Sequence, residues 1–340
     1  MSVFDILFGA MPTMLYSQFF RYPQIPQTDC LGKTIIVTGA NTGLGKEAAR
    51  HFVRLGASKV IIACRSVAKG EEAKRDIEAT TRRTGVLEVW PLDLVDYDSV
   101  EAFATRAEGL ERLDVVLENA GVNTQKFTIV AGNEMNVTVN VVGTFLLALL
   151  LIPKLRSDSR KYGFTPTLTM VTSELHAFVP FNERKEPGIF TRLNDETKSA
   201  SASAMASRYP VTKLLEIFAL REIAREHPVK QLGCTLNLVN PGWCHSELAR
   251  ELGDSGFAAA AFGVVMKIMC RTTDAGSRTL VDAAISHGTE THGQYISDQR
   301  VAKVSPLVAS PEGLDVQKRV WHELSEKLEG IQPGILKNLD

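Results

Sequence analysis

A tyrosine and a lysine four residues apart, Tyr209 and Lys213, could act as an acid–base pair. In a helix this spacing places the two side chains one turn apart on the same face. A phenol with an ordinary pKa of about 10 is a poor base at neutral pH, and a neighbouring ammonium group lowers that pKa. The alternative is an ordinary core helix, because apolar residues at Leu214, Leu215 and Phe218 follow with helical spacing. Spacing alone does not choose between the two.

A serine hydroxyl would complement this pair. Ser173 follows the apolar run "TLTMVT" and therefore lies at the end of a predicted strand. Its hydroxyl could hold a carbonyl oxygen in place while Tyr209 donates a proton to it. That arrangement suits hydride transfer, in which a cofactor supplies the hydride and the protein supplies the proton.

A glycine-rich segment, "VTGANTGLGK" at 37–46, joins a predicted strand to a predicted helix. Gly39, Gly43 and Gly45 permit positive φ angles and a close approach of the backbone to a ligand. The helix that follows offers free N–H groups and the positive end of its dipole to a pyrophosphate. The strand–turn–helix context favours a dinucleotide site over a tight turn without a ligand.

Arg65 suggests which dinucleotide is bound. An NAD site usually carries an acidic residue near the end of the second strand, where this chain has Cys64 and Arg65. A carboxylate would repel a 2′-phosphate, whereas a guanidinium pairs with it. We therefore expect NADP(H), the alternative being that Arg65 is only a solvated loop charge. Asp93 follows the third strand, and Asn119 with Gly121 follows the fourth.

The elements that position these residues alternate along the chain. The apolar runs that predict strands lie at 33–38, 59–64, 86–90, 113–117, 167–172 and 234–239, with helices between them, among them 43–55, 67–82, 130–155 and 209–226. This alternation predicts an α/β fold, a doubly wound parallel sheet with helices on both faces. No break in composition interrupts it, so one domain is expected.

We divide the chain into an N-terminal extension (1–31), the cofactor-binding domain (32–305) and a C-terminal helical tail (306–340). Two segments, 176–207 and 243–273, follow late strands, at the sheet edge where open α/β sheets bind ligands. The second contains Phe257, Phe262, Val264, Val265 and Met266, which predicts an apolar, bulky substrate. The alternative is that these side chains only pack a lid helix onto the core.

Composition excludes several functions. A net charge of −1 and the absence of a dense basic run argue against nucleic-acid binding. Five cysteines without CxxC spacing argue against a zinc site or a disulfide framework and favour a reducing, cytoplasmic setting. The apolar run at 141–153 is too short to span a membrane. Residues 1–20 are expected to pack on the domain, with peripheral membrane contact or a partner surface as the alternatives.

Taken together in order, these motifs resemble the short-chain dehydrogenase/reductase family. The glycine-rich motif spans Thr38–Gly45, the N-A-G motif Asn119–Gly121, and the helix asparagine is Asn140. Ser173, then Tyr209 with Lys213, then the P-G motif at Pro241 and Gly242 complete the set. The resemblance covers about residues 32 to 300. "GANTGLGKEAA" and "ACRSVAKGE" are similar to the retinol-dehydrogenase-like branch, and the long segment before Tyr209 is similar to fungal reductases of secondary metabolism.

The resemblance implies a role for each residue. Tyr209 is the general acid/base, Lys213 lowers its pKa and holds the nicotinamide ribose, and Ser173 orients the substrate oxygen. Asn140 keeps a water in a proton relay to Lys213. The cofactor would further be held by Gly39, Asn41, Thr42, Gly43, Leu44, Gly45, Arg65, Asp93 (adenine), Asn119 (adenosine ribose), Gly242 and Ser246 (carboxamide).

Three features depart from the family pattern. Glu118 stands where asparagine is usual, which puts a local structural bond in doubt. Pro210 follows the tyrosine directly, so we expect it to mark the start of the helix, with Tyr209 in the first turn. Tyr209 lies 36 positions after Ser173, and the insertion between them is expected to form a wall over the substrate.

These observations predict an NADP(H)-dependent oxidoreductase that interconverts a ketone or aldehyde and an alcohol on an apolar substrate. One alternative is oxidation of a retinol- or sterol-like alcohol. Another is a cofactor-binding protein that catalyses a non-redox rearrangement. Since the family often pairs its long helices between subunits, the resemblance also implies a homodimer.

Overall fold

A mostly parallel sheet forms the centre of the molecule. The computed structural model describes residues 11–245 and 270–340. Across the sheet the strand order is β10-β9-β8-β7-β4-β1-β2-β3. The strands are β1 Thr34–Thr38, β2 Lys59–Cys64, β3 Leu87–Pro91, β4 Val115–Glu118, β7 Thr167–Val171, β8 Thr235–Asn240, β9 Tyr295–Ser297 and β10 Arg300–Val301; β5 Ile129–Val130 and β6 Asn133–Glu134 form a separate hairpin.

The six apolar runs of the sequence are the parallel strands of this sheet. Every residue of β1 and β7 is buried, as expected for strands covered on both faces. The predicted doubly wound fold is therefore confirmed. β9 and β10 were not predicted, because three and two residues are too few to show a pattern. β10 pairs antiparallel with β9 and forms one edge of the sheet.

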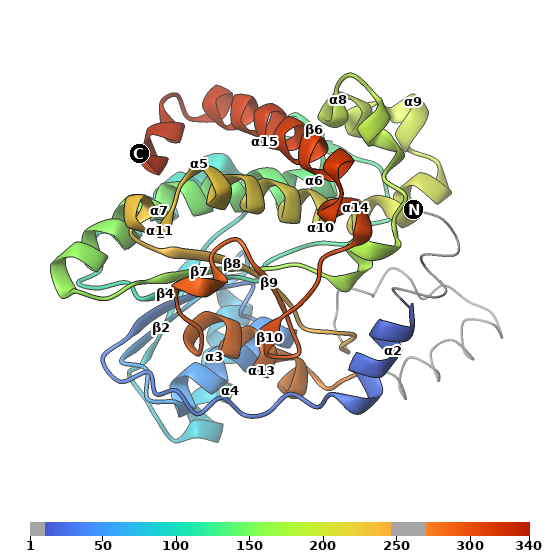
Figure 1. Cartoon of the computed structure of the whole chain (residues 1–340). Coiled ribbons are helices and arrows are strands. Elements are labelled where there is room, and N and C mark those ends of the chain that lie inside the picture. Colours follow the sequence, from blue (N-terminus) through green and yellow to red (C-terminus); the bar gives the residue numbers. More distant parts are fainter. Residues whose placement is uncertain (1–10, 246–269) are drawn as a thin grey trace.

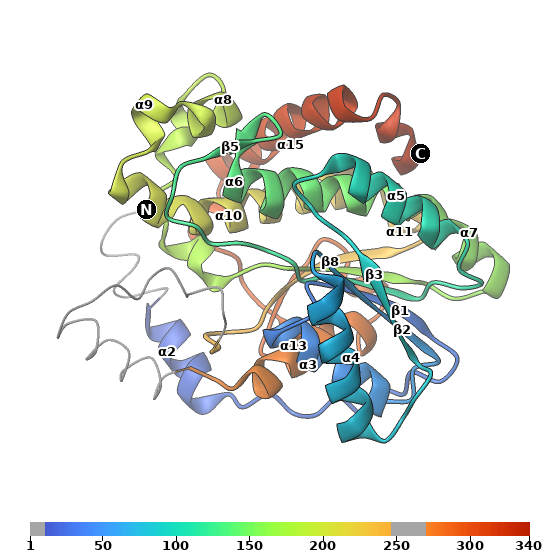
Figure 2. The same cartoon turned by 180° about the vertical axis from the view of Figure 1, so that it is seen from behind.

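Helices cover both faces (Figures 1 and 2). One layer contains α5, α7 and α10, and the other contains α3, α4 and α13. The described helices are α2 Met11–Phe20, α3 Gly43–Arg54, α4 Val67–Thr81, α5 Tyr97–Glu108, α6 Met135–Val137, α7 Thr144–Tyr162, α8 Ile189–Asn194, α9 Glu196–Ser199, α10 Ala202–Glu226, α11 Val229–Leu232, α13 Thr273–Ile285, α14 Pro306–Ala309 and α15 Pro311–Ile331. Shorter helical turns are η2 Thr138–Gly143, η3 Glu174–Phe178, η4 Asn182–Lys185, η6 Thr289–Thr291 and η7 Ile335–Leu339.

The prediction that Pro210 marks the start of a helix is wrong. Helix α10 begins two turns earlier, at Ala202, where the Ser201 side chain accepts a hydrogen bond from the Ala204 N–H. Pro210 therefore lies inside the helix and leaves the carbonyl of Ala206 without its usual N–H donor. Because Ala206 is exposed, water can satisfy that carbonyl. Tyr209 thus sits in the body of a long helix.

The helix predicted at 130–155 starts later and ends later. Residues 129–134 form the β5–β6 hairpin, and a helical stretch then runs from Met135 to Tyr162 through the π-helical turn η2. This stretch is long and apolar enough to cross a membrane, but 89% of its most apolar window is buried inside the protein. It is a core helix, packed in the same layer as α5 and in contact with it.

The insertion before Tyr209 is folded and held by the C-terminal helix. Its apolar side chains at Phe181, Ile189 and Phe190 are fully buried in the core. The Glu323 carboxylate of α15 accepts hydrogen bonds from the N–H groups of Ile189 and Phe190, at the start of α8. Arg184 pairs with Glu312 at 2.7 Å. The C-terminal tail is helical, as predicted, and α15 lies along α10.

The N-terminal extension packs on the domain over its described part, as expected. Arg271 donates hydrogen bonds to the carbonyls of Ser17 and Arg21, at the end of α2, and also pairs with Asp298 at 2.9 Å. Gln18 donates to the carbonyl of Trp243, which follows β8. The extension therefore lies against the carboxyl edge of the sheet.

Candidate active site

The glycine-rich loop ends at an open helix terminus. Gly39 and Gly43 have φ angles of +64° and +57°, a conformation that favours glycine. Thr42 precedes α3, and its side chain makes no capping hydrogen bond. The first N–H groups of a helix have no acceptor within the helix, so those of α3 remain available to an anion. A side chain at Gly43 would meet no atom within 4 Å, which leaves space for a ligand there.

Asn119 braces this loop from the neighbouring strand β4. Its Nδ2 donates to the carbonyl of Thr38 at 2.9 Å, and its backbone N–H donates to the Thr38 hydroxyl at 3.0 Å. A Cβ added to Gly45 would lie against Asn119 Nδ2 and 2.6 Å from the Gly39 carbonyl oxygen. Only glycine fits between these groups. Asn119 therefore shapes the loop, and the contact to the adenosine ribose that the resemblance implies stays a prediction.

The remaining predicted cofactor residues lie at the same edge, with one exception. Arg65 is exposed directly after β2, and no hydrogen bond or ion pair joins it to another residue within 11–245 or 270–340. Asp93 follows β3 and accepts a hydrogen bond from the Val95 N–H. Gly242 follows β8 with a φ of +77°. Asn41, Thr42 and Leu44 are half-buried between the glycines. Ser246 lies outside the described residues, as do the five apolar residues at 257–266.

These residues fit a nicotinamide dinucleotide. The uncapped start of α3 and the space at Gly43 suit a pyrophosphate, and Arg65 would meet a group attached to the adenosine ribose. When bound, such a cofactor supplies or accepts a hydride.

Tyr209, Lys213 and Ser173 come together beside this loop, at the carboxyl end of β7. The Lys213 Nζ lies 5.6 Å from the centre of the Tyr209 ring and donates to the carbonyl of Val171 at 2.8 Å. Ser173 follows β7, and its hydroxyl is close enough to the Tyr209 phenol to lower the pKa of that phenol. All three are placed by β7 and α10, and the Thr172 hydroxyl, which donates to the carbonyl of Lys213, joins the two elements.

The site is buried, and burial controls its titration. Burial raises the pKa of Tyr209 above its ordinary value, although Lys213 and Ser173 lower it. Lys213 lowers the pKa of Tyr209, as predicted, but this effect is smaller than the rise caused by burial. Burial would lower the pKa of Lys213, yet its carboxylate neighbour Glu216 and Tyr209 raise it above its ordinary value. At neutral pH the pair is therefore a phenol beside an ammonium group.

Asn140 lies in the π-helical turn η2 and is fully buried. Its Nδ2 donates to the carbonyl of Val122 and to the Thr212 hydroxyl, and its Oδ1 accepts from the Val122 N–H. Both Asn140 Oδ1 and Lys213 Nζ lie within 4 Å of a Cβ built on Gly121. Asn140, the residue predicted to hold the relay water, therefore lies beside Lys213. Its side chain also joins the segment after β4 to α10.

Two buried acids at this site were not predicted. Glu216 binds the Lys213 ammonium through Oε1 at 2.8 Å, and Glu118 is buried nearby with both carboxyl oxygens lacking partners in the described chain. In the sequence Glu118 is only a departure from a motif, and Glu216 is one polar residue within an apolar run. The spacing of Glu216 three residues after Lys213 is the one available signal.

His176 has a structural role. Its Nδ1 donates to the carbonyl of Ser173 at 2.7 Å, and its Nε2 accepts from the Ser305 N–H at 3.1 Å. Burial lowers the pKa of this imidazole to about 4, so it is neutral at physiological pH. His176 therefore links the chain after Ser173 to the segment that leads into α14.

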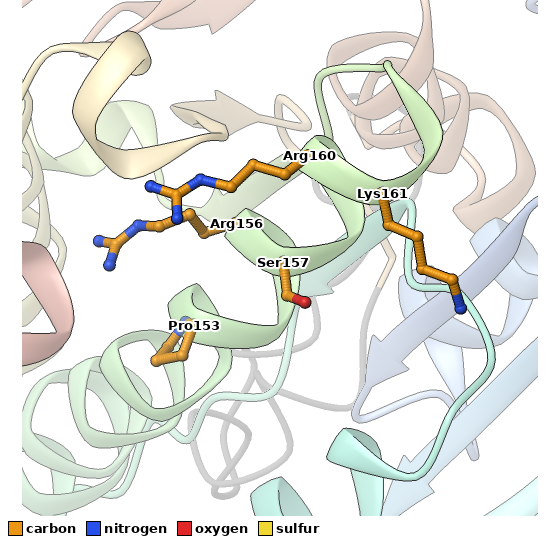
Figure 3. Close-up of a pocket in the computed structure, with 5 residues that line it drawn as sticks. All are labelled: Pro153, Arg156, Ser157, Arg160 and Lys161. Carbon is orange, nitrogen blue, oxygen red and sulfur yellow. The ribbon is translucent and has the colours of Figure 1, made fainter.

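A hollow of about 530 Å³ lies away from these residues, near the C-terminal end of α7 (Figure 3). Its lining residues are Pro153, Arg156, Ser157, Arg160 and Lys161. Helix α7 starts beside Asn140 and ends before β7 begins, so this hollow is at the amino edge of the sheet. Arg156 there donates to the carbonyls of Leu232 and Asn338, which is a structural role.

The sequence profile described as "short chain dehydrogenase" matches residues 33–164. A short chain dehydrogenase/reductase of Cryptosporiopsis sp. (strain 8999), dmxR8, is 45% identical over 328 residues, which covers 95% of this chain and 99% of that protein. The chain belongs to the short-chain dehydrogenase/reductase family. A short-chain dehydrogenase of Penicillium roqueforti, anuD, is 41% identical over 95% of this chain and 84% of its own length. The resemblance to fungal reductases is confirmed.

A solved structure shares this fold. A crystal structure of an uncharacterised protein from Mycobacterium paratuberculosis superposes with a TM-score of 0.64 at 25% identity, covering 90% of this chain and 96% of that one. As a short-chain dehydrogenase/reductase, the protein is an oxidoreductase that binds a nicotinamide cofactor and acts on CH–OH or C=O groups.

Gly45→Ala should weaken cofactor binding at least about tenfold, because the added methyl displaces Asn119 or the Gly39 carbonyl from the loop. Binding is measured by titrating NADPH and NADH against the quenching of protein fluorescence. The matched control is Gly330→Ala near the end of α15, where a Cβ meets no atom within 4 Å. An unchanged affinity in Gly45→Ala would show that the loop does not carry the cofactor.

Proposed function

We propose that this short-chain dehydrogenase/reductase is an NADP(H)-dependent reductase of a ketone or aldehyde on an apolar substrate, with Tyr209 as the proton donor. The observation that carries the proposal is the meeting of Tyr209, Lys213 and Ser173 at the carboxyl edge of β7. A substrate oxygen near Ser173 would receive a hydrogen bond from its hydroxyl. Tyr209 would then donate its proton to that oxygen as the carbonyl carbon is reduced.

The protonation state of the site supports reduction. Since the pKa of Tyr209 is above its ordinary value, the phenol carries its proton at neutral pH, which is the form that a proton donor needs. Oxidation would require the phenolate as a base. For this reason, we favour reduction over oxidation of a retinol- or sterol-like alcohol.

The choice of NADP(H) rests on Arg65. Its guanidinium is exposed at the end of β2, where an NAD site would carry an acid, and it is free to pair with a 2′-phosphate. The fungal relatives make a role in secondary metabolism a natural proposal for this chain. A reducing, cytoplasmic setting, proposed from the cysteine usage, would keep the cofactor in its reduced form.

The family resemblance implies a homodimer, but one face of α10 is already covered within the chain. α15 packs along α10, and its side chains Val320, Trp321 and Leu324 are buried. We propose that any dimer uses a surface other than this face of α10. Peripheral membrane contact through residues 1–20 also stays a proposal, to which the exposed side chains of Phe19 and Phe20 lend support.

Arg65→Asp should reverse the cofactor preference, because the carboxylate repels a 2′-phosphate and accepts hydrogen bonds from a ribose diol. We expect NADPH affinity to fall about tenfold or more while NADH affinity is kept or improved, as measured by fluorescence titration. Arg75→Asp, the same charge change on the exposed side of α4, is the control and should leave the ratio unchanged. An unaltered ratio in Arg65→Asp would remove Arg65 from the phosphate site.

Tyr209→Phe should lower turnover at least about a hundredfold while leaving NADPH binding nearly intact, because only the proton donor is lost. Turnover is followed as NADPH consumption with a panel of apolar ketones and aldehydes. Tyr97→Phe, a half-buried tyrosine on α5, is the matched control. Undiminished turnover in Tyr209→Phe would show that Tyr209 is not the proton donor.

A further inference from the structure

Two acidic side chains lie in the buried layer between the sheet and α10, next to the reacting pair. Glu216 is on α10, three residues after Lys213 and seven after Tyr209, so all three share one helix face. Glu118 is the last residue of β4, and its side chain points into the same layer. Both carboxyl groups are buried, with at most 3% of either residue exposed.

The buried Lys213 ammonium needs hydrogen-bond acceptors and a counter-charge. A buried ammonium is costly unless acceptors surround it. In the described chain its acceptors are the Val171 carbonyl and Glu216 Oε1, both at 2.8 Å. Glu216 is therefore the counter-charge that keeps Lys213 ionised and aimed along α10 toward the end of β7.

Glu118 cannot be a second counter-charge. Neither of its oxygens has a hydrogen-bond partner in the described chain, and Oε2 of Glu216 also lacks one. Two buried carboxylates near each other cannot both be ionised at low cost, so one of them keeps a proton. Burial and the charge of Glu216 raise the pKa of Glu118 well above its ordinary value, which leaves Glu118 as the protonated member.

We propose that Glu216 is a positioning residue of the active site, which fixes the Lys213 ammonium and thereby sets how readily Tyr209 releases its proton, with Glu118 as its neutral neighbour. The ionisable groups that face Glu216 are Lys213 and Tyr209 on α10 and Glu118 on β4. The catalytic meaning of this arrangement rests on the proposed role of Tyr209. The electrostatic coupling itself does not depend on that role.

The sign of the coupling follows from charge. The Glu216 carboxylate stabilises the neutral phenol relative to the phenolate, because like charges repel. Replacing Glu216 by the neutral, isosteric glutamine removes one negative charge from the site. The phenolate of Tyr209 then has only the Lys213 ammonium nearby and should form at lower pH.

The test is a titration of Tyr209 in the full-length protein, without substrate or cofactor. Tyrosinate absorbance is measured against pH for the wild type and for Glu216→Gln. In each background the curve of the Tyr209→Phe variant is subtracted, which isolates Tyr209 from the other tyrosines. We expect Glu216→Gln to lower the Tyr209 midpoint by about one pH unit. An unchanged or raised midpoint would overturn the proposal.

Glu118→Gln is the matched control. Glu118 makes no bond to the Lys213 ammonium or to any other group in the described chain, so its replacement by glutamine should shift the Tyr209 midpoint clearly less than Glu216→Gln does. A shift as large as that of Glu216→Gln would mean that Glu118 carries the charge, which contradicts the assignment.

A measurement on the unaltered protein covers the case in which Glu216→Gln does not fold. With ¹³C-labelled glutamate carboxyls, the resonance of Glu216 should titrate near pH 7, because burial raises its pKa and Lys213 only partly offsets that rise. The pKa of Glu174 is also raised to about 7, and its resonance is identified by its loss in Glu174→Gln. The resonance of Glu118 should stay at the chemical shift of a protonated acid. A Glu118 carboxyl, assigned by its loss in Glu118→Gln, that is ionised at neutral pH would overturn the proposal, as would a Glu216 carboxyl that stays protonated at about pH 9. If Tyr209→Phe keeps its turnover, the proposed function fails while these titrations still decide the coupling.

Discussion

The burial of the Lys213 ammonium is the constraint on which the site depends. A charge removed from water must find acceptors, and here they come from two directions, the carbonyl at the end of β7 and Glu216 on the same helix. The bond to the Val171 carbonyl fixes the position of α10 along the sheet, and Glu216 holds the ammonium in that direction. Tyr209, one turn earlier on that helix, is thereby held at the carboxyl edge beside Ser173.

The surrounding structure keeps this arrangement rigid. Asn140 joins the chain after β4 to α10 through Thr212, and the Thr172 hydroxyl joins β7 to α10. Behind the helix, α15 packs on α10 and also holds the insertion through Glu323. On the other side of the sheet, Asn119 keeps the glycine loop close to the end of β4. The loop and the reacting side chains are thus positioned by one network around neighbouring strands.

The sequence predicts much of this fold, because strands buried on both faces leave continuous apolar runs. β9 and β10 are too short to leave such a trace. The start of α10 was misplaced because a proline usually marks the first turn of a helix. Pro210 is tolerated inside α10 because Ala206, whose carbonyl loses its N–H donor, is exposed to water, and only the fold determines that exposure. The residues of the glycine-rich loop, Ser173, Tyr209 and Lys213 were predicted because their motifs occur in the order expected for the family. Glu118 and Glu216 were missed because their chemistry comes from burial and from each other, which sequence spacing does not show.

The central claim is that the glycine loop and the Tyr209–Lys213 pair serve one bound cofactor. The most direct measurement is a crystal structure of the full chain with NADP⁺. The account predicts the pyrophosphate at the start of α3, the 2′-phosphate at Arg65, and the nicotinamide ring beside Tyr209 and Lys213. A nicotinamide ring bound away from Tyr209, or a cofactor held outside the glycine loop, would contradict it.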